Sequence, residues 1–233
     1  MPCTLPASLA DAAVCRGSFH AVLGREVEDT VFAGFSAALQ KAQAEGQILT
    51  ASLFRYENHL FFYAEGLNRP FTPQGLCPAL DAALLPWPPA LGEAAPRPWA
   101  AMQPYFYHDV PTTAADWQQG RCPQRRRGRI ALLPPDSWCS YMEHHLRIVT
   151  EGLVEGDRWH LICVQEGVLF SYLEEPRTNV NIRHQPGAHS PELDAWIAAD
   201  PESHFARFTP EQKAHPDSGH NFVFLSRIAG TED

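Results

Sequence analysis

The sequence predicts an α+β protein made of two tandem copies of one βαββαβ unit. Three observations carry this prediction: an internal repeat, the same order of elements in both halves, and a length of 233 residues, which is enough for two domains of common size. The segment LFFYAE at residues 60–65 recurs as LFSYLE at 169–174, and PALDA at 78–82 recurs as PELDA at 191–195. Because 45% of the residues are hydrophobic and 19% are charged, the chain can fill two packed cores.

The first copy reads as strand, helix, strand, strand, helix, strand. Its long helical pattern ends at Glu45-Gly46, and glycine is a usual helix stop. Two apolar runs joined by residues 56–59 form a hairpin, and Pro78 suits the first turn of the second helix. The expected elements occupy, in order, residues 19–23, 27–44, 48–54, 60–64, a helix from 78, and 104–109.

The second copy repeats this order. In its long helix, Met142, Leu146, Val149 and Leu153 recur at the spacing of a stripe that faces the core, and the helix is expected to end at Glu155-Gly156. The expected elements occupy residues 129–133, 138–155, 159–164, 169–173, a helix from 191, and 221–228.

This order of elements is the ferredoxin-like unit, in which two helices cover one face of a four-stranded antiparallel sheet. The other face needs an apolar cover, so we expect the two sheets to pack face to face within one chain, as an intrachain dimeric α/β-barrel. The expected domains are a first repeat at 18–111 with a degenerate site, a polar linker at 112–128, and a second repeat at 129–230 with the candidate site. We expect a monomeric pseudo-dimer or a homodimer.

Composition and charge exclude several classes of partner and site. A formal charge of −9 opposes binding to phosphate backbones, so nucleic acid is not an expected partner. The sequence has no apolar run long enough for a transmembrane helix, so no membrane partner is expected, and no export signal, which predicts a cytoplasmic protein. Six cysteines without a CxxC motif indicate neither a disulfide framework nor a thiolate metal site.

One polar pair distinguishes the second copy. Tyr141 and His145 are four residues apart, so they lie one turn apart on one helix face, beside the expected core stripe. Aligning the two long helices on their expected terminal glycines places Val31 opposite Tyr141 and Phe35 opposite His145. Imidazole titrates near neutral pH, which suits a group that accepts and donates a proton. The alternative is a buried pair that only satisfies its own hydrogen bonds.

The same helix carries a family resemblance. Its pattern is Pro-Asp, then Tyr, then His four residues later, then Ile and Glu, at Pro135, Asp136, Tyr141, His145, Ile148 and Glu151. This pattern resembles L-rhamnose mutarotase and related proteins, small ferredoxin-like chains that dimerise through their sheets. The resemblance covers about half of the chain, and it implies that Tyr141 and His145 help to interconvert sugar anomers.

The resemblance therefore predicts an isomerase that binds a monosaccharide and needs no cofactor or metal. His145 is the expected proton carrier, with Tyr141 orienting it or acting as a second donor. Trp196 is expected to provide a flat wall for the sugar. Trp159 and His160 are further candidates for substrate binding, but they alternate along a strand, so at most one of them faces the cavity.

Two other classes stay open. The second class is metal or haem binding, which the eleven histidines suggest. They follow no recognised metal-ligand pattern, but haem-degrading monooxygenases use paired ferredoxin-like units with a histidine, so a monooxygenase-like protein that binds haem or a metabolite is an alternative. A non-enzymatic module that holds a small metabolite is the third class. The Glu174–Glu175 pair ends a strand and is expected to be a solvated strand end and not a catalytic dyad.

Overall fold

The computed structural model describes residues 5–152, 154–177, 183–184, 187, 189–212, 218–219 and 221–231. The chain divides into two compact units. Unit 1 comprises Met1–Met102, Pro111–Pro123 and Ser226–Asp233, and unit 2 comprises Gln103–Val110 and Gln124–Leu225.

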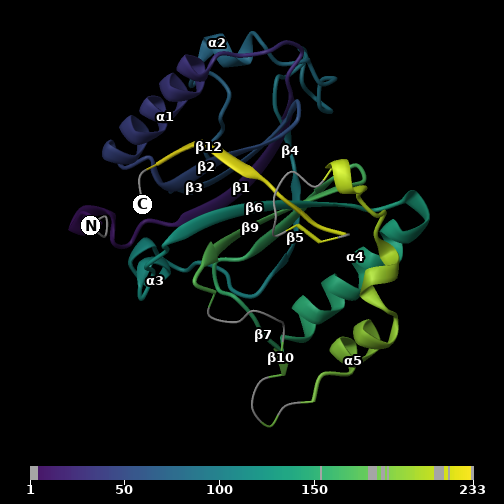
Figure 1. Ribbon diagram of the computed structural model, residues 1–233. Helices are drawn as coiled ribbons and strands as arrows, with labels where there is room; N and C mark the ends of the chain where they lie inside the picture. Colours follow the sequence, from purple (N-terminus) through teal and green to yellow (C-terminus); the bar gives the residue numbers. More distant parts are fainter. Residues whose placement is uncertain are drawn as a thin grey trace. The chain divides into compact units, whose positions relative to one another are not determined.

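Unit 1 holds a five-stranded antiparallel sheet in the order β12-β2-β3-β1-β4 (Figure 1). Helix α1 packs on one face of this sheet through Phe32, Phe35 and Leu39, against strand residues that include Leu53 and Phe62. The strands are β1 (Val14–Val22), β2 (Ile48–Tyr56), β3 (His59–Leu67), β4 (Ala100–Ala101) and β12 (Ser226–Gly230). The helices are η1 (Ala7–Leu9), α1 (Asp29–Ala44), α2 (Pro78–Asp81) and α3 (Ala114–Gln118).

Unit 2 repeats the plan with a sheet in the order β11-β6-β9-β8-β5. Helices α4 and α5 lie side by side in Figure 1 and contact each other. The strands are β5 (Gln103–Tyr107), β6 (Arg125–Leu132), β8 (Leu161–Gln165), β9 (Val168–Glu175) and β11 (Val223–Phe224), beside the separate pair β7 (Val154–Glu155) and β10 (Arg183–His184). The helices are α4 (Pro135–Glu151), α5 (Pro191–Ala198), η2 (Pro201–His204) and η3 (Pro210–Gln212).

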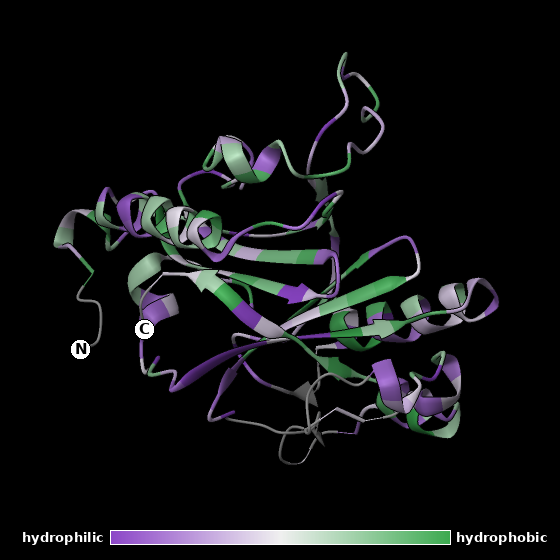
Figure 2. Ribbon diagram, turned by 45° about the horizontal axis from the view of Figure 1, so that its top comes forward, coloured by the Kyte–Doolittle hydropathy of each residue, from purple (hydrophilic) through white to green (hydrophobic). Residues whose placement is uncertain are grey.

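The predicted α+β class and the two tandem ferredoxin-like units are confirmed by this topology. The hairpins and the helix starts at Pro78 and Pro191 lie where the sequence predicts them. The helices carry both hydrophobic and hydrophilic residues around their turns (Figure 2), as helices with one buried face do. Among the described residues, no helix is long and apolar enough to cross a membrane.

The closing strand of each repeat divides in two, which the sequence analysis missed. In the first half of the chain, β4 pairs with β1 of unit 1, whereas β5 pairs with β8 of unit 2. In the second half, β11 pairs with β6 of unit 2, whereas β12 pairs with β2 of unit 1. Each sheet therefore takes its fifth strand from the other half of the sequence, and that strand covers an edge that would otherwise be unpaired.

The segment expected as a linker, 112–128, contains α3 and the first residues of β6. Within β6, Arg126 pairs with Glu174 (Nε to Oε1, 3.5 Å) and Arg127 pairs with Glu175 (Nη1 to Oε1, 2.9 Å). Tyr172 also donates a hydrogen bond to Glu174 at 2.6 Å. The expectation of a solvated strand end is therefore wrong for Glu174, which is buried. The residue limits of the two repeats stay a prediction.

Helix α4 also differs from the expectation. It ends at Gly152, whose φ of 66° is in the left-handed region that glycine adopts readily, and not at Gly156. Its buried residues are Tyr141, His145 and Ile148, whereas Leu146 of the expected core stripe is 60% exposed. Leu153, also expected in that stripe, lies outside the described residues. The helix is thus turned by about one residue, roughly 100°, from the expected orientation.

Candidate functional site

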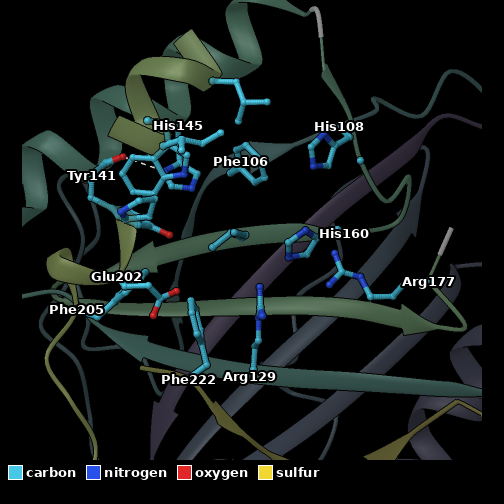
Figure 3. Close-up of a pocket in the computed structure, with 16 residues that line it drawn as sticks. Phe106, His108, Arg129, Tyr141, His145, His160, Arg177, Glu202, Phe205 and Phe222 are labelled. Atoms are coloured by element: carbon cyan, nitrogen blue, oxygen red, sulfur yellow. Dashed lines mark hydrogen bonds between the residues drawn. The ribbon is translucent and has the colours of Figure 1, made fainter. Parts of the chain in front are cut away.

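A cavity of about 480 Å³ lies in unit 2 between α4, α5 and the sheet (Figure 3). Its size is in the range of small-molecule sites. Five aromatic side chains line it: Phe106, Tyr141, Trp196, Phe205 and Phe222. Six groups with acid–base or charged character line it as well: His108, Arg129, His145, His160, Arg177 and Glu202.

The sheet forms one wall of the cavity. Phe106 on β5 lies opposite Ile162 on β8, Ile162 lies opposite Ser171 on β9, and Ser171 lies opposite Arg129 on β6. Residues directly opposite each other across neighbouring strands share a face of the sheet. Strand register therefore sets Phe106, Ile162 and Arg129 in one row under the helices, and all three line the cavity.

Helix α4 places Tyr141 and His145 on the opposite wall, one turn apart. Their ring centroids are 4.2 Å apart, and the ring of Trp196 on α5 lies 5.2 Å from Tyr141 and 4.7 Å from His145. The ring of Phe106 lies 4.8 Å from His145. Both polar rings are therefore held by aromatic contacts on several sides.

His145 has a defined tautomer. Its Nδ1 lies 2.9 Å from the backbone carbonyl oxygen of Tyr141, which only accepts, so the Nδ1–H must donate. Burial lowers the pKa of His145 to about 4. The ring is neutral at neutral pH, and its lone pair is on Nε2, which has no hydrogen-bonding partner among the residues that the structure describes. That nitrogen can accept a proton from a ligand.

The phenol of Tyr141 is a proton donor at neutral pH. Burial raises its pKa to about 12, although Tyr105 and Arg129 act in the opposite direction. Burial also raises the pKa of Tyr105 well above its usual value. The helix wall thus offers a neutral base at His145 and a neutral hydrogen-bond donor at Tyr141.

The sheet wall is cationic. Burial, followed by repulsion from Arg177, lowers the pKa of Arg129 to about 10, so Arg129 keeps its charge at neutral pH. Arg177 pairs with Asp157 at 3.2 Å (Nε to Oδ2). Burial and the nearby Arg177 lower the pKa of His108 to about 4. In Figure 3, Arg129, His160 and Arg177 lie on the strand side of the cavity.

Unit 1 provides an internal comparison for the helix positions. Gly46 and Gly152 both follow the long helix with positive φ, so they align the two helices. This alignment places Phe35 opposite Tyr141 and Leu39 opposite His145, and all four side chains are buried. It corrects the earlier pairing by one helical turn. The prediction that copy one has apolar residues where copy two has this polar pair holds in the corrected alignment.

The same comparison extends to the sheet wall. In unit 1 the row equivalent to Phe106, Ile162, Ser171 and Arg129 consists of Ala229, Leu53, Phe62 and Phe19. Arg129 therefore takes the position of Phe19, and Ser171 takes that of Phe62. The rings of Phe19 and Phe62 contact each other at 6.3 Å, and Phe35 contacts Phe62 at 5.8 Å. Unit 1 fills with aromatic rings the space where unit 2 has polar groups.

Four of the five predicted site residues line the cavity: Tyr141, His145, Trp196 and His160. Trp159 is buried and is not among the lining residues, as expected if at most one of Trp159 and His160 faces the cavity. Glu151, not expected to be catalytic, accepts a hydrogen bond from Ser190 at the start of α5.

The sequence analysis missed Arg129, His108, Phe106 and Glu202. Arg129 could have been found by aligning β1 with β6, because a charged residue there replaces Phe19. His108 and Phe106 follow the unexpected strand β5 into unit 2, and no local signal in the sequence shows that. Among the described residues, no group of three or more His, Cys, Asp or Glu side chains is arranged to hold a metal ion.

Comparison with known proteins gives only distant structural similarity. No family model and no curated protein matches the sequence, so the resemblance to L-rhamnose mutarotase is not supported. A putative monooxygenase from Fusobacterium nucleatum is 10% identical, with a TM-score of 0.43 over 94% of each chain. One from Lactobacillus acidophilus is 6% identical, with a TM-score of 0.39 over 94% of this chain and 96% of that one. An anthrone oxidase-like protein is 7% identical, with a TM-score of 0.38 over 94% and 92%. Similarities this weak assign no activity to this chain.

Proposed function

We propose that unit 2 binds a small organic molecule in its cavity and that His145 accepts a proton from this molecule as a general base. The observation that carries the proposal is the state of His145: its Nδ1–H is engaged by the Tyr141 carbonyl, and its unprotonated Nε2 has no partner among the described residues. The low pKa keeps the His145 ring unprotonated at neutral pH, while it also makes Nε2 a weaker base than an exposed imidazole. No cofactor is needed for such a proton transfer.

Tyr141 assists in this proposal by donating a hydrogen bond to the oxygen on which negative charge develops. Its phenol stays protonated at neutral pH, and its ring contacts that of His145. The rings of Trp196 and Phe106 provide flat apolar walls beside the pair. His160 contributes a polar edge on the strand side of the cavity.

Mutarotation is the first specific reaction to test. His145 would take the proton of the anomeric hydroxyl while Tyr141 donates to the ring oxygen, so that the bond between the anomeric carbon and the ring oxygen breaks and an open-chain aldehyde forms. Closure on the other face of the carbonyl returns both protons. The presence of Tyr141, His145 and Trp196 around one cavity favours this reaction. The substrate contact of Trp159, the cytoplasmic location and the oligomeric state stay predictions.

A monooxygenase-like activity is the second candidate. Here His145 would deprotonate a phenol or enol, and dioxygen would oxidise the resulting anion: one oxygen atom would be incorporated as a new carbonyl group and the other would leave as water. The observation that favours it is the cation Arg129 on the sheet wall, which stabilises a negative oxygen more than a neutral sugar requires. A binding module without catalysis is the remaining class, and it needs the cavity but not the base.

Saturation-transfer NMR with a panel of aldoses tests the first reaction, and dioxygen consumption with phenols tests the second. Wild-type protein should accelerate one of the two. His145→Gln should reduce that rate by about 100-fold or more, the usual contribution of a general base. Tyr141→Phe should reduce it less, and His189→Gln, at an exposed position, should leave it unchanged. An unchanged rate in His145→Gln removes His145 as the base, and no acceleration by the wild type leaves only the binding module.

A further inference from the structure

Arg129 is a cation on the cavity wall that has no counter-ion among the described residues. It makes no ion pair with any residue that the structure describes, and its Nε is shielded from solvent without a hydrogen-bond acceptor. Its neighbours on the same strand differ, because Arg126 and Arg127 each pair with a glutamate of β9. Arg126 and Arg127 therefore have acidic partners within the sheet, whereas Arg129 has none among the described residues.

The groups around Arg129 do not neutralise it. The carboxylate of Glu202 is not within ion-pair distance and accepts a hydrogen bond from the amide of Asn221. Arg177 repels Arg129, as the lowered pKa of Arg129 reflects. The more distant carboxylate of Glu202 and the ring of Phe222, whose centroid lies 4.4 Å from the guanidinium carbon, compensate the charge in part. A donor that is shielded from solvent and has no acceptor is destabilising, the more so when it is charged, so an anion at this position relieves that cost.

The remaining walls indicate the shape of that anion. Phe106 shares the sheet row with Arg129, and Trp196 on α5 also lines the cavity. Aromatic lining side chains favour a flat ligand, because aromatic surfaces stack. At about 480 Å³ the cavity has room for one or two rings.

Unit 1 shows that the fold does not need a charge here. At the equivalent position Phe19 packs on the core, and Phe62 stands where unit 2 has Ser171. A phenylalanine at position 129 would bury apolar area without the cost of an unpaired cation. The arginine is therefore unexplained by folding and explained by a ligand.

We infer that the ligand of this cavity is a planar organic anion, such as an aromatic or enolic carboxylate, and that Arg129 binds its carboxylate. This inference uses the cavity of the proposed function, and the ligand class that it names fits the phenol or enol of the second candidate reaction and not an aldose. It does not depend on proton transfer at His145. Binding and catalysis can therefore fail separately.

Isothermal titration calorimetry with benzoate, benzamide and acetate tests the inference. Benzamide has the same shape as benzoate without the charge, and acetate has the charge without the ring. Benzoate should bind wild-type protein about 10- to 100-fold more tightly than either, as expected for a charge-assisted hydrogen bond plus stacking. Equal affinity for benzoate and benzamide, or no binding of benzoate, overturns the inference.

Variants locate the effect. Arg129→Gln should lose the preference for benzoate over benzamide, whereas Arg129→Lys, which keeps the charge, should retain part of it. Arg147→Gln, on the exposed side of α4, is the matched control and should behave like the wild type. Benzoate preference that persists in Arg129→Gln contradicts the assignment. His145→Gln should reduce proton transfer by about 100-fold or more but keep benzoate binding, so the failure of the proposed function and that of this inference are distinguishable.

Discussion

Acid should destabilise the protein through His145. Burial lowers the pKa of His145 from 6.5 to about 4, so between these two values the unfolded state binds a proton that the folded state does not. The stability that comes from keeping the ring neutral is complete above the unfolded pKa and is lost as the pH falls toward the folded one. A difference of about 2.5 pKa units at about 1.36 kcal/mol each gives a full loss of about 3 kcal/mol, of which about 2 kcal/mol should appear by about pH 5.

Urea unfolding of the wild type and His145→Gln at a series of pH values measures this loss. Between about pH 7 and about pH 5 the wild type should lose about 2 kcal/mol more than the variant. His108 has a similarly lowered pKa, but it is present in both proteins and cancels in the difference. His189→Gln, at an exposed site, is the control and should follow the wild type. Parallel curves for the wild type and His145→Gln, or an NMR titration of His145 near 6.5, would refute the reasoning.

Three further substitutions test the structure. Arg121→Met leaves the buried carboxylate of Glu65 without its bidentate partner (2.7 and 2.9 Å). The unfolding free energy should fall by about 3–5 kcal/mol at neutral pH, and by less in acid, where Glu65 is protonated. A small loss at neutral pH would contradict the pairing. In Gly156→Ala the new methyl group collides with the ring of His108. Chemical denaturation should therefore show a loss of about 1–3 kcal/mol in unfolding free energy, together with weaker ligand binding. Unchanged stability and unchanged ligand binding would contradict this contact. Glu151→Ala removes the acceptor for the buried Ser190 hydroxyl. The unfolding free energy should fall by about 1–2 kcal/mol, and the melting temperature should fall with it. An unchanged melting temperature would show that the fold does not depend on this hydrogen bond.

Local patterns in the sequence predicted the elements that depend on local chemistry. Pro78 and Pro191 begin helices because proline suits the first turn, and the hairpins follow from two apolar runs with a short connection. The end of helix α4 was harder to predict, because either Gly152 or Gly156 could serve as the glycine that ends the helix, and the helix ends at Gly152. The exchange of β5 and β12 was not predictable, because a strand's partner is set by tertiary pairing and not by its own residues.

For the candidate site, too, the residues that could be predicted are those that depend on local sequence patterns. Tyr141 and His145 were found because spacing of four residues on one helix is a local property. Arg129 was expected to begin the strand at 129–133, but its position opposite Ser171, and so its place in the cavity wall, depends on strand register. His108 reaches the cavity only through the strand exchange. Site residues that come together through pairing between distant strands could therefore not be predicted from the sequence.

Our central claim is that the polar residues of unit 2 serve a ligand, whereas unit 1 has apolar residues at the same positions for stability. Replacing Tyr141 and His145 together by their unit 1 equivalents, as Tyr141→Phe with His145→Leu, tests it by urea unfolding at neutral pH, with proton transfer measured on the same protein. The account predicts a stability equal to or above that of the wild type and a loss of proton transfer. A loss of several kcal/mol in stability, with proton transfer retained, would show that the pair holds the fold together and does no chemistry.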